Sequence, residues 1–282
     1  MAQERRSDGT IQLTAGRKTD LILSNPIMPA AGCYGFGPEY SELVDGDVLG
    51  AVVVGPVTAR PRRGAAPPRL VAIPGGGALL HTGLDNPGIG RMLHRHASDW
   101  AHLSVPVIVH VAGTTPHEAA RCCQRLTGVE NVVGIELGLA DSVLIEDAEA
   151  IVQAARSASV QPLIVRLPLR RADELCSLAV DAGADALTVG APPRGTAQDP
   201  KTGSFVTGRL YGRFVFPLAL RQVRLVLDRV SVPVIGCGGV YEKEQVDAML
   251  ESGAAAVQVG AALWEDPSSL GRLARSLSSP TL

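Results

Sequence analysis

Aromatic residues are scarce in this chain: only 4% of its 282 residues are Phe, Trp or Tyr. Its hydrophobic core must therefore be built from aliphatic side chains, and 46% of the residues are apolar. This length and apolar content fit one large α/β domain or one barrel. An excess of one charge is also lacking, because the formal net charge is −2. Without a long basic run, the sequence predicts no nucleic-acid partner.

The five cysteines are scattered and form no Cys-x-x-Cys pair. They stand at positions 33, 122, 123, 176 and 237. This spacing argues against a zinc site or a cysteine-ligated iron–sulfur cluster. A disulfide scaffold is also unexpected in a chain of this size. We therefore expect no metal site.

Long hydrophobic runs are absent. No apolar stretch approaches the roughly 20 residues that cross a bilayer, and residues 1–9 are polar where a secretory signal would be apolar. We expect a cytoplasmic protein with no membrane partner, in which residues 1–9 form a disordered tail.

Short aliphatic runs alternate with helical patterns along the whole chain. Their apolar residues are continuous, which is typical of parallel strands covered on both faces. Eight strands are expected, at residues 26–30, 50–54, 105–111, 132–139, 162–167, 186–189, 233–236 and 255–259. With no second domain or linker in view, the sequence predicts a single (β/α)8 TIM barrel over residues 1–282.

Local signals support this alternation. Thr115-Pro116 begins a helix, with Thr as N-cap and Pro in the first turn. Gly183 and Gly253 each end a helix just before a strand. We expect residues 10–24 to form an N-terminal β-hairpin that plugs the bottom of the barrel. The segments 60–87 and 192–212 exceed simple connectors, and such loops are usually functional or mobile.

The last two predicted strands each break into glycine or small residues. The first reads Val-Ile-Gly-Cys-Gly-Gly-Val over 234–240, and the second reads Ala-Val-Gln-Val-Gly-Ala-Ala over 256–262. Backbone N–H groups at such breaks bind phosphate in (β/α)8 barrels. This pattern predicts a phosphate cradle; the alternative is a set of tight-turn glycines. Its residues are Gly236, Gly238, Gly239, Gly260 and Ala261.

Four motifs in order resemble the dihydroorotate dehydrogenases. They are Asn-Pro-Ile-Met-Pro-Ala-Ala-Gly at 25–32 followed by Gly-Phe-Gly at 35–37, Pro-Arg-Arg-Gly at 61–64 with Pro-Pro-Arg at 67–69, Gly-Leu-Asp-Asn-Pro-Gly at 83–88, and the cradle. The resemblance spans about residues 10–270. It implies an FMN-binding barrel of the soluble class, whose activity is the oxidation of dihydroorotate to orotate. Besides the cradle, it places FMN against Ala30, Ala31, Gly32, Arg166, Gly190 and Gly212.

The resemblance fails at the residues expected to do chemistry. The orotate-binding asparagines of the family correspond here to Leu80, His110, Gly138 and Gly190. The catalytic cysteine becomes Asp141, the strand-five lysine becomes Arg166, and a Lys–Thr pair becomes Gly-Pro at 55–56. A pocket built to hydrogen-bond its ligand loses affinity steeply when those partners vanish. We therefore expect FMN binding without dihydroorotate oxidation.

Two residues are candidate proton acceptors. Asp141 is either a general base or the N-cap of a helix over 142–155. His110 ends strand three, where it contacts flavin or substrate or is simply a hydrogen-bonded core residue. Arg166 lies inside an apolar strand, so it faces either an anionic ligand or flavin edge, or an internal carboxylate such as Glu136. The candidate substrate residues, with exposed loop positions as the alternative, are His81, Arg209 and Tyr211.

Three functions follow from these observations. The first is an FMN-dependent oxidoreductase acting on a small molecule other than dihydroorotate, with a separate electron-transfer partner possible because no acceptor motif is present. The second is a non-redox barrel that binds a phosphorylated ligand, or a catalytically silent partner subunit. The third and least favoured is ordinary dihydroorotate dehydrogenase activity. The resemblance also implies a homodimer.

Overall fold

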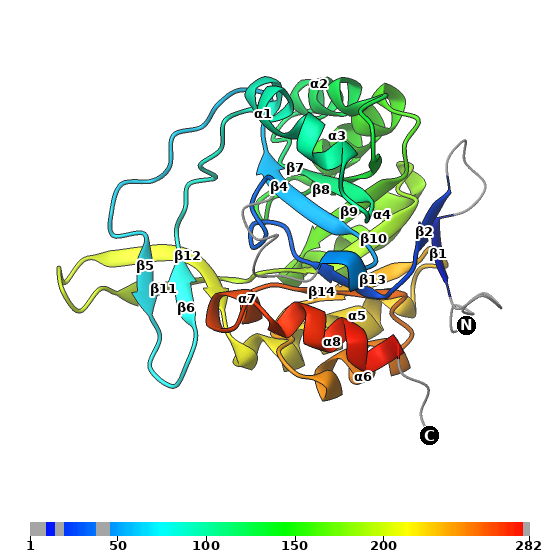
Figure 1. The fold of residues 1–282 in the computed structure, drawn as a ribbon. Helices are drawn as coiled ribbons and strands as arrows, with labels where there is room; N and C mark the ends of the chain where they lie inside the picture. The colour runs from blue at the N-terminus through cyan, green and yellow to red at the C-terminus, as the bar shows by residue number, and fades with distance from the viewer. Residues whose placement is uncertain (1–9, 15–19, 38–45, 279–282) are drawn as a thin grey trace.

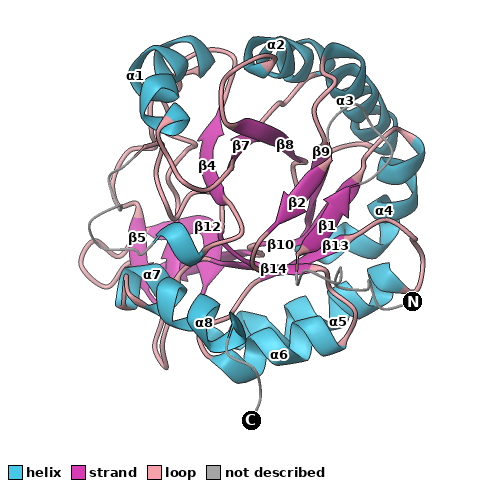
Figure 2. Ribbon diagram, turned by 45° about the vertical axis from the view of Figure 1, so that its right-hand side comes forward, coloured by secondary structure: helices cyan, strands magenta, loops and turns pink. Residues whose placement is uncertain are grey.

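The computed structural model describes residues 10–14, 20–37 and 46–278, so the tail predicted for 1–9 lies outside the described residues. Eight parallel strands form a ring with helices outside it (Figure 2). In spatial order the strands are β3 (Ile27–Pro29), β14 (Ala256–Val259), β13 (Val234–Cys237), β10 (Ala186–Ala191), β9 (Leu163–Pro168), β8 (Val132–Gly138), β7 (Val107–Val111) and β4 (Val52–Val57). The two end strands are joined by bonds such as Gly32 N–H to Gly55 O (2.8 Å). The predicted (β/α)8 barrel is confirmed.

Helices alternate with these strands as the sequence patterns predict. They are α1 (Ile89–Ala101), α2 (Pro116–Leu126), α3 (Ile145–Ala158), α4 (Ala172–Asp181), α5 (Phe216–Leu227), α6 (Lys243–Glu251), α7 (Ala262–Glu265) and α8 (Ser269–Ser278). Short 3-10 turns lie at η2 (Gly46–Val48), η3 (Leu169–Arg171) and η4 (Arg213–Val215). The predicted helix start is confirmed, because Thr115 Oγ1 accepts a hydrogen bond from Glu118 N–H (3.2 Å). Gly183 ends α4 with φ +111°, where glycine is favoured.

The predicted hairpin consists of β1 (Ile11–Thr14) and β2 (Leu21–Leu23), paired antiparallel. Its buried Leu13 and Leu23 pack in one cluster with Ile108 and Ile164, which lie near the beginnings of β7 and β9. Parallel strands all begin at the same end of a barrel, so the hairpin closes the end opposite to the strand termini. The site must therefore lie at the other end.

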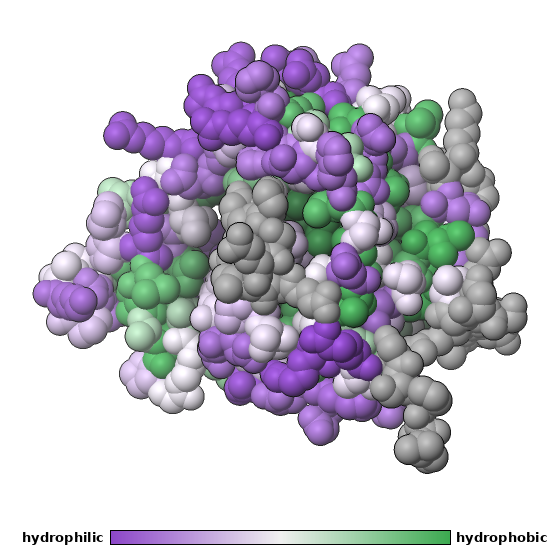
Figure 3. Space-filling model, viewed as in Figure 1, coloured by the Kyte–Doolittle hydropathy of each residue, from purple (hydrophilic) through white to green (hydrophobic). Residues whose placement is uncertain are grey.

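The two long segments form a second sheet beside the barrel mouth. Its strands are β5 (Leu70–Ala72), β6 (Ala78–Leu80), β11 (Arg194–Gln198) and β12 (Phe205–Tyr211), in the order β11-β12-β6-β5. This sheet projects from the barrel in Figure 1 and carries apolar side chains in Figure 3. In its register Arg209 lies opposite Leu80 and Tyr211 opposite Ala78. The pairing of β12 with β6 brings Arg209 and Tyr211 to the mouth.

Across the described ranges, no helix is long and apolar enough to cross a membrane. In those same ranges no group of three or more His, Cys, Asp or Glu side chains gathers as a metal site would require.

Candidate active site

A narrow cavity lies where the strands end, between β3, β10, β13 and β14. Most of the residues predicted to contact the cofactor line it, namely Ala30, Ala31, Arg166, Gly190, Gly212, Gly238, Gly239, Gly260 and Ala261. Gly32 instead lines the wider cavity next to it. We call the narrow space the cradle cavity and the wider one the mouth cavity. The cradle predicted from two separate strand ends is thus one continuous site.

The cradle cavity has a backbone suited to an anion. Within the described residues, the N–H groups of Gly239, Gly260 and Ala261 have no hydrogen-bond acceptor. Gly239 has φ +68°, and a Cβ there would lie 2.3 Å from the backbone nitrogen of Phe216. Unpaired N–H groups at a glycine-rich turn are the donors that bind phosphate oxygens in other proteins.

Gly236, unlike the other predicted cradle residues, is not among the lining residues of the cradle cavity. It lies within β13, and a Cβ added there would meet the sulfur of Met249 at 2.8 Å. Met249 is on α6, so the Cα–H of Gly236 points to the helix layer. Its small size serves strand–helix packing, and a role of Gly236 in the cradle stays a prediction.

The mouth cavity, about 420 Å³ in volume, lies over the strand ends and under the projecting sheet. It shares Ala31, Arg166, Pro192 and Tyr211 with the cradle cavity, so the two spaces are adjoining. Among the described residues its lining includes no Asn, Gln, Lys or Cys side chain. A volume of this size suits a small organic molecule or a planar ring. The side-chain amides that the family resemblance implies for orotate are thus absent from its described lining.

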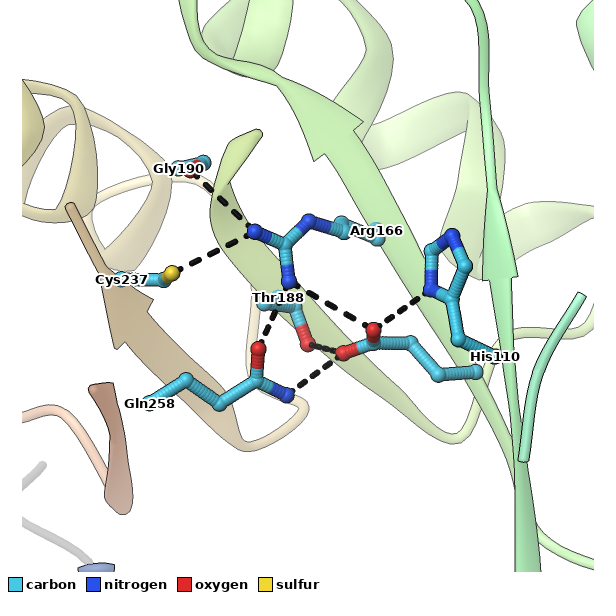
Figure 4. A network of polar contacts seen from close by, with 7 residues as sticks. His110, Arg166, Thr188, Gly190, Cys237 and Gln258 are labelled. Atoms are coloured by element: carbon cyan, nitrogen blue, oxygen red, sulfur yellow. Dashed lines mark hydrogen bonds and ion pairs between the residues drawn. The ribbon is translucent and has the colours of Figure 1, made fainter. Parts of the chain in front are cut away.

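Below this cavity, a buried carboxylate joins residues of five strands. Glu136 Oε1 is 2.7 Å from His110 Nδ1 and 3.5 Å from Arg166 Nη1. Glu136 Oε2 accepts hydrogen bonds from Thr188 Oγ1 (2.7 Å) and Gln258 Nε2 (2.6 Å). Figure 4 shows these groups converging from neighbouring strands. Such full satisfaction is what allows a charged group to remain buried.

The network fixes the charge of its members. Burial opposes ionisation of Glu136, but the nearby Arg166 charge and the bonds from His110 and Thr188 outweigh it and lower the pKa of Glu136 from 4.5 to about 2. Burial likewise opposes the charge of Arg166, yet Cys237 and Glu136 raise its pKa overall. Glu136 and Arg166 therefore form a buried ion pair at neutral pH.

Arg166 reaches from this network to the cradle cavity. Its Nη1 donates to Gln258 Oε1 (2.7 Å), and its Nη2 lies 3.3 Å from Cys237 Sγ and 3.5 Å from the Gly190 carbonyl oxygen. The internal ion pair considered for Arg166 is thus present. Arg166 also lines both cavities, so a ligand edge can contact the same guanidinium.

His110 is held by Glu136 and faces the mouth cavity, which it lines. Because Nδ1 lies on a carboxylate, a neutral His110 carries its proton there and presents Nε2 as an acceptor. The Nε2 atom lies beside Gly138: a Cβ built at Gly138 would be 2.8 Å from it. The imidazole therefore occupies space that any side chain at position 138 would need.

Asp141 lies farther out, at the loop after β8. Its carboxylate pairs with the two terminal guanidinium nitrogens of Arg209, at 2.9 Å (Oδ1–Nη1) and 2.7 Å (Oδ2–Nη2). It lines an outer cavity rather than the mouth cavity. It does not cap a helix, because α3 begins at Ile145 with Leu144 at the N-cap. The cap interpretation was wrong.

The three predicted substrate residues separate in the structure. Tyr211 and Arg209 line both the mouth cavity and the outer cavity, whereas His81 lines only the outer cavity. The Tyr211 ring packs on Trp264 at a centroid distance of 4.8 Å, and burial raises the pKa of its hydroxyl. Tyr211 and Arg209 are thus placed to touch a ligand, while His81 lies outside the inner space.

Cys33 and Cys237 line the cradle cavity as protonated thiols. Burial raises the pKa of Cys33 to about 12 and also raises the pKa of Cys237. Neither thiol is poised as a nucleophile at neutral pH, because thiolate is the reactive form. Both act as small packing residues.

Thr188 and Gln258 were missed by the sequence analysis. Each is a polar residue at an inward position of an otherwise apolar strand, in Ala-Leu-Thr-Val-Gly-Ala and Ala-Val-Gln-Val. Glu136 has the same signature but was considered only as a partner of Arg166. A buried polar group in a continuous apolar run needs a partner, and that rule would have grouped the three.

The donor set fits FMN. The cradle offers unpaired N–H groups for a phosphate, and the adjoining mouth cavity is wide enough for a flat ring. Arg166, which lines both, supplies a positive charge at the boundary. The described lining of the mouth cavity, by contrast, has no side-chain amide.

Comparisons with known proteins agree with this architecture. The family model for dihydroorotate dehydrogenase matches residues 17–280. The chain is 35% identical over 263 residues to the catalytic subunit of dihydroorotate dehydrogenase B (NAD(+)) of Geobacillus kaustophilus, covering 88% of this chain and 84% of that one. The same subunit of Bacillus pumilus is 36% identical with the same coverage.

A crystal structure of the Eimeria tenella enzyme DHODH in complex with ferulenol superposes with a TM-score of 0.73 at 17% identity, covering 94% of this chain and 83% of that chain. This similarity supports the fold alone. The family model and the bacterial relatives, taken with the barrel and its cradle, decide the family. The chain belongs to the dihydroorotate dehydrogenase family.

Proposed function

We propose that the protein is an FMN-dependent oxidoreductase that acts on a small molecule other than dihydroorotate. One observation carries the proposal: a cradle with unpaired N–H groups adjoins a mouth cavity whose lining, among the described residues, has no side-chain amide. The cradle retains the N–H donors that the FMN phosphate needs. The mouth cavity lacks the amides that orotate needs, and the loss of several hydrogen-bonding partners abolishes useful affinity.

Different residues of the chain would bind the phosphate and the ring of FMN. Gly239, Gly260 and Ala261 would hold the FMN phosphate, and Arg166 would lie at the edge of the flavin ring. When bound, FMN supplies the hydride-accepting chemistry. Arg166 stays charged under all ordinary conditions, so it favours negative charge on a bound group beside it.

His110 is the better of the two proposed proton acceptors. It lines the mouth cavity directly, and its Nδ1 is held by Glu136 at 2.7 Å, which leaves Nε2 to take a proton from a substrate. Asp141 lines the outer cavity and has both oxygens on Arg209. A carboxylate engaged on both oxygens must first break its ion pair to act as a base.

Dihydroorotate oxidation is the second candidate, because the bacterial relatives carry that name. The mouth cavity opposes it at the positions of Leu80, His110 and Gly138, where the family resemblance implies asparagines. The cradle and the fully hydrogen-bonded Glu136 network favour a working redox site over the non-redox alternatives.

The visible spectrum of the purified protein tests the proposal. Flavin absorption near roughly 370 and 450 nm is expected, and it should persist when dihydroorotate is added without oxygen. Bleaching by dihydroorotate would make the protein an ordinary member of its family. A colourless protein that cannot be reconstituted with FMN would leave a non-redox function.

The relatives are named as catalytic subunits of an NAD(+) enzyme, so we also propose a separate electron-transfer partner for this chain. The homodimer and the cytoplasmic location stay predictions. Size-exclusion chromatography with light scattering measures the first directly.

A further inference from the structure

Every cation that lines the mouth cavity is already beside a carboxylate. The pairs are Arg69 with Asp85 (3.5 Å), Arg166 with Glu136 (3.5 Å) and Arg209 with Asp141 (2.7 Å). His110 shares the Glu136 carboxylate. The described lining of this cavity thus offers no unpaired positive side chain to a ligand.

The pair between Arg209 and Asp141 lies where the mouth cavity meets the outer cavity. It joins β12 to the loop after β8, and Arg209 lines both the mouth cavity and the outer cavity. Arg209 Nη1 also donates to the Pro192 carbonyl oxygen (2.6 Å). Both side chains are about three-quarters buried, at 29% and 25% exposure. The guanidinium is therefore neutralised where a substrate passes.

The remaining lining is mainly apolar. Phe36, Leu84, Leu139 and Trp264 contribute hydrophobic surface to the mouth cavity. Thr114, a hydroxyl residue at its rim, already bonds Glu118. An anion entering this space would lose water and would meet only guanidinium groups whose charge a neighbouring carboxylate already offsets, and such a transfer is costly.

We infer that the substrate of the mouth cavity is an uncharged, largely apolar molecule, and that Asp141 excludes anions by neutralising Arg209. The inference deepens the proposed function, since it concerns the substrate of that site. It rests on that proposed function, while the ion pairs that it invokes belong to the protein itself.

Isothermal titration calorimetry with orotate, an anion, and uracil, the same ring without the carboxylate, tests this inference. The wild-type protein should bind orotate with a Kd no tighter than about 1 mM. Asp141→Asn keeps the shape of the side chain but frees the charge of Arg209. This variant should bind orotate at least about 10-fold more tightly than the wild type, because a charge-assisted bond to carboxylate becomes available.

The double variant Asp141→Asn/Arg209→Gln is the matched control and should lose the gain. Uracil affinity should be the same in all three proteins. A wild-type Kd for orotate below about 1 mM overturns the inference, and so does an unchanged orotate affinity in Asp141→Asn. An equal gain for uracil would show that charge is not the cause. Flavin content, read separately from the absorption spectrum, reports on the proposed function independently.

Discussion

Replacing Glu136 with glutamine tests the centre of the site. The side chain is fully buried and its carboxylate is shared by His110, Arg166, Thr188 and Gln258. Glu136→Gln keeps the size but leaves the Arg166 guanidinium buried without its counter-charge. Breaking a buried ion pair by removing one partner costs about 3–5 kcal/mol. We expect the variant to lose stability of that size at pH 7.

The stability difference between wild type and Glu136→Gln should also depend on pH. Folding lowers the pKa of Glu136 from 4.5 to about 2, so its contribution to stability is complete above pH 4.5 and is lost as the pH falls toward about 2. A lowering of that size corresponds to about 3 kcal/mol. The stability difference between wild type and Glu136→Gln should therefore shrink steadily between pH 4.5 and about 2.

Urea denaturation midpoints at several pH values measure this difference. Glu149→Gln is a suitable control: Glu149 is exposed and bonds only Gln153 among the described side chains, so its loss should change stability by less than about 0.5 kcal/mol. Equal stability of Glu136→Gln and wild type at pH 7, or a difference that does not change with pH, would refute the charged network.

Three further substitutions test, in turn, the phosphate cradle, the packing of a strand on a helix, and the mouth cavity. Gly239→Ala places a Cβ 2.3 Å from the Phe216 nitrogen at φ +68°, so flavin content of the purified protein should fall sharply. Gly236→Ala meets Met249 at 2.8 Å, so it should lower the free energy of unfolding, measured by urea denaturation, by about 1–3 kcal/mol yet retain FMN. Gly138→Asn should cost a similar amount, because its Cβ would lie 2.8 Å from the His110 ring.

The sequence predicted the barrel well because its signal is local. Mainly aliphatic runs such as 107–111 and 163–168 are strands buried on both faces, and each can be recognised from its own residues alone. The projecting sheet was not predicted. Its strands are short, half-exposed and paired across more than a hundred residues, as in β6 with β12. No periodic pattern in the sequence predicts a pairing between such distant strands.

In the site, too, features with a local sequence signal could be predicted and long-range contacts could not. The cradle glycines follow strands whose ends the sequence marks, so most of them line one cavity in the structure. Gly236 does not line it, and a glycine run in the sequence does not show which member faces the helices. The ion pair of Asp141 with Arg209 joins two distant segments, and sequence spacing gave no reason to join them. Pairwise contacts of this kind depend on the fold and not on any one segment.

We propose that the residues at positions 110 and 138 form a coupled pair in this site. The family resemblance implies asparagine at both positions, and here His110 fills the space that a side chain at Gly138 would require. If the two changes are coupled, His110→Asn should relieve most of the cost of Gly138→Asn, and the double variant should be more stable than the sum of the single effects predicts. Residues in contact typically show a coupling of about 0.5–3 kcal/mol. Strictly additive changes in the free energy of unfolding would mean that the two positions are not coupled. A measured coupling would support the proposal that this site is matched to a substrate other than dihydroorotate.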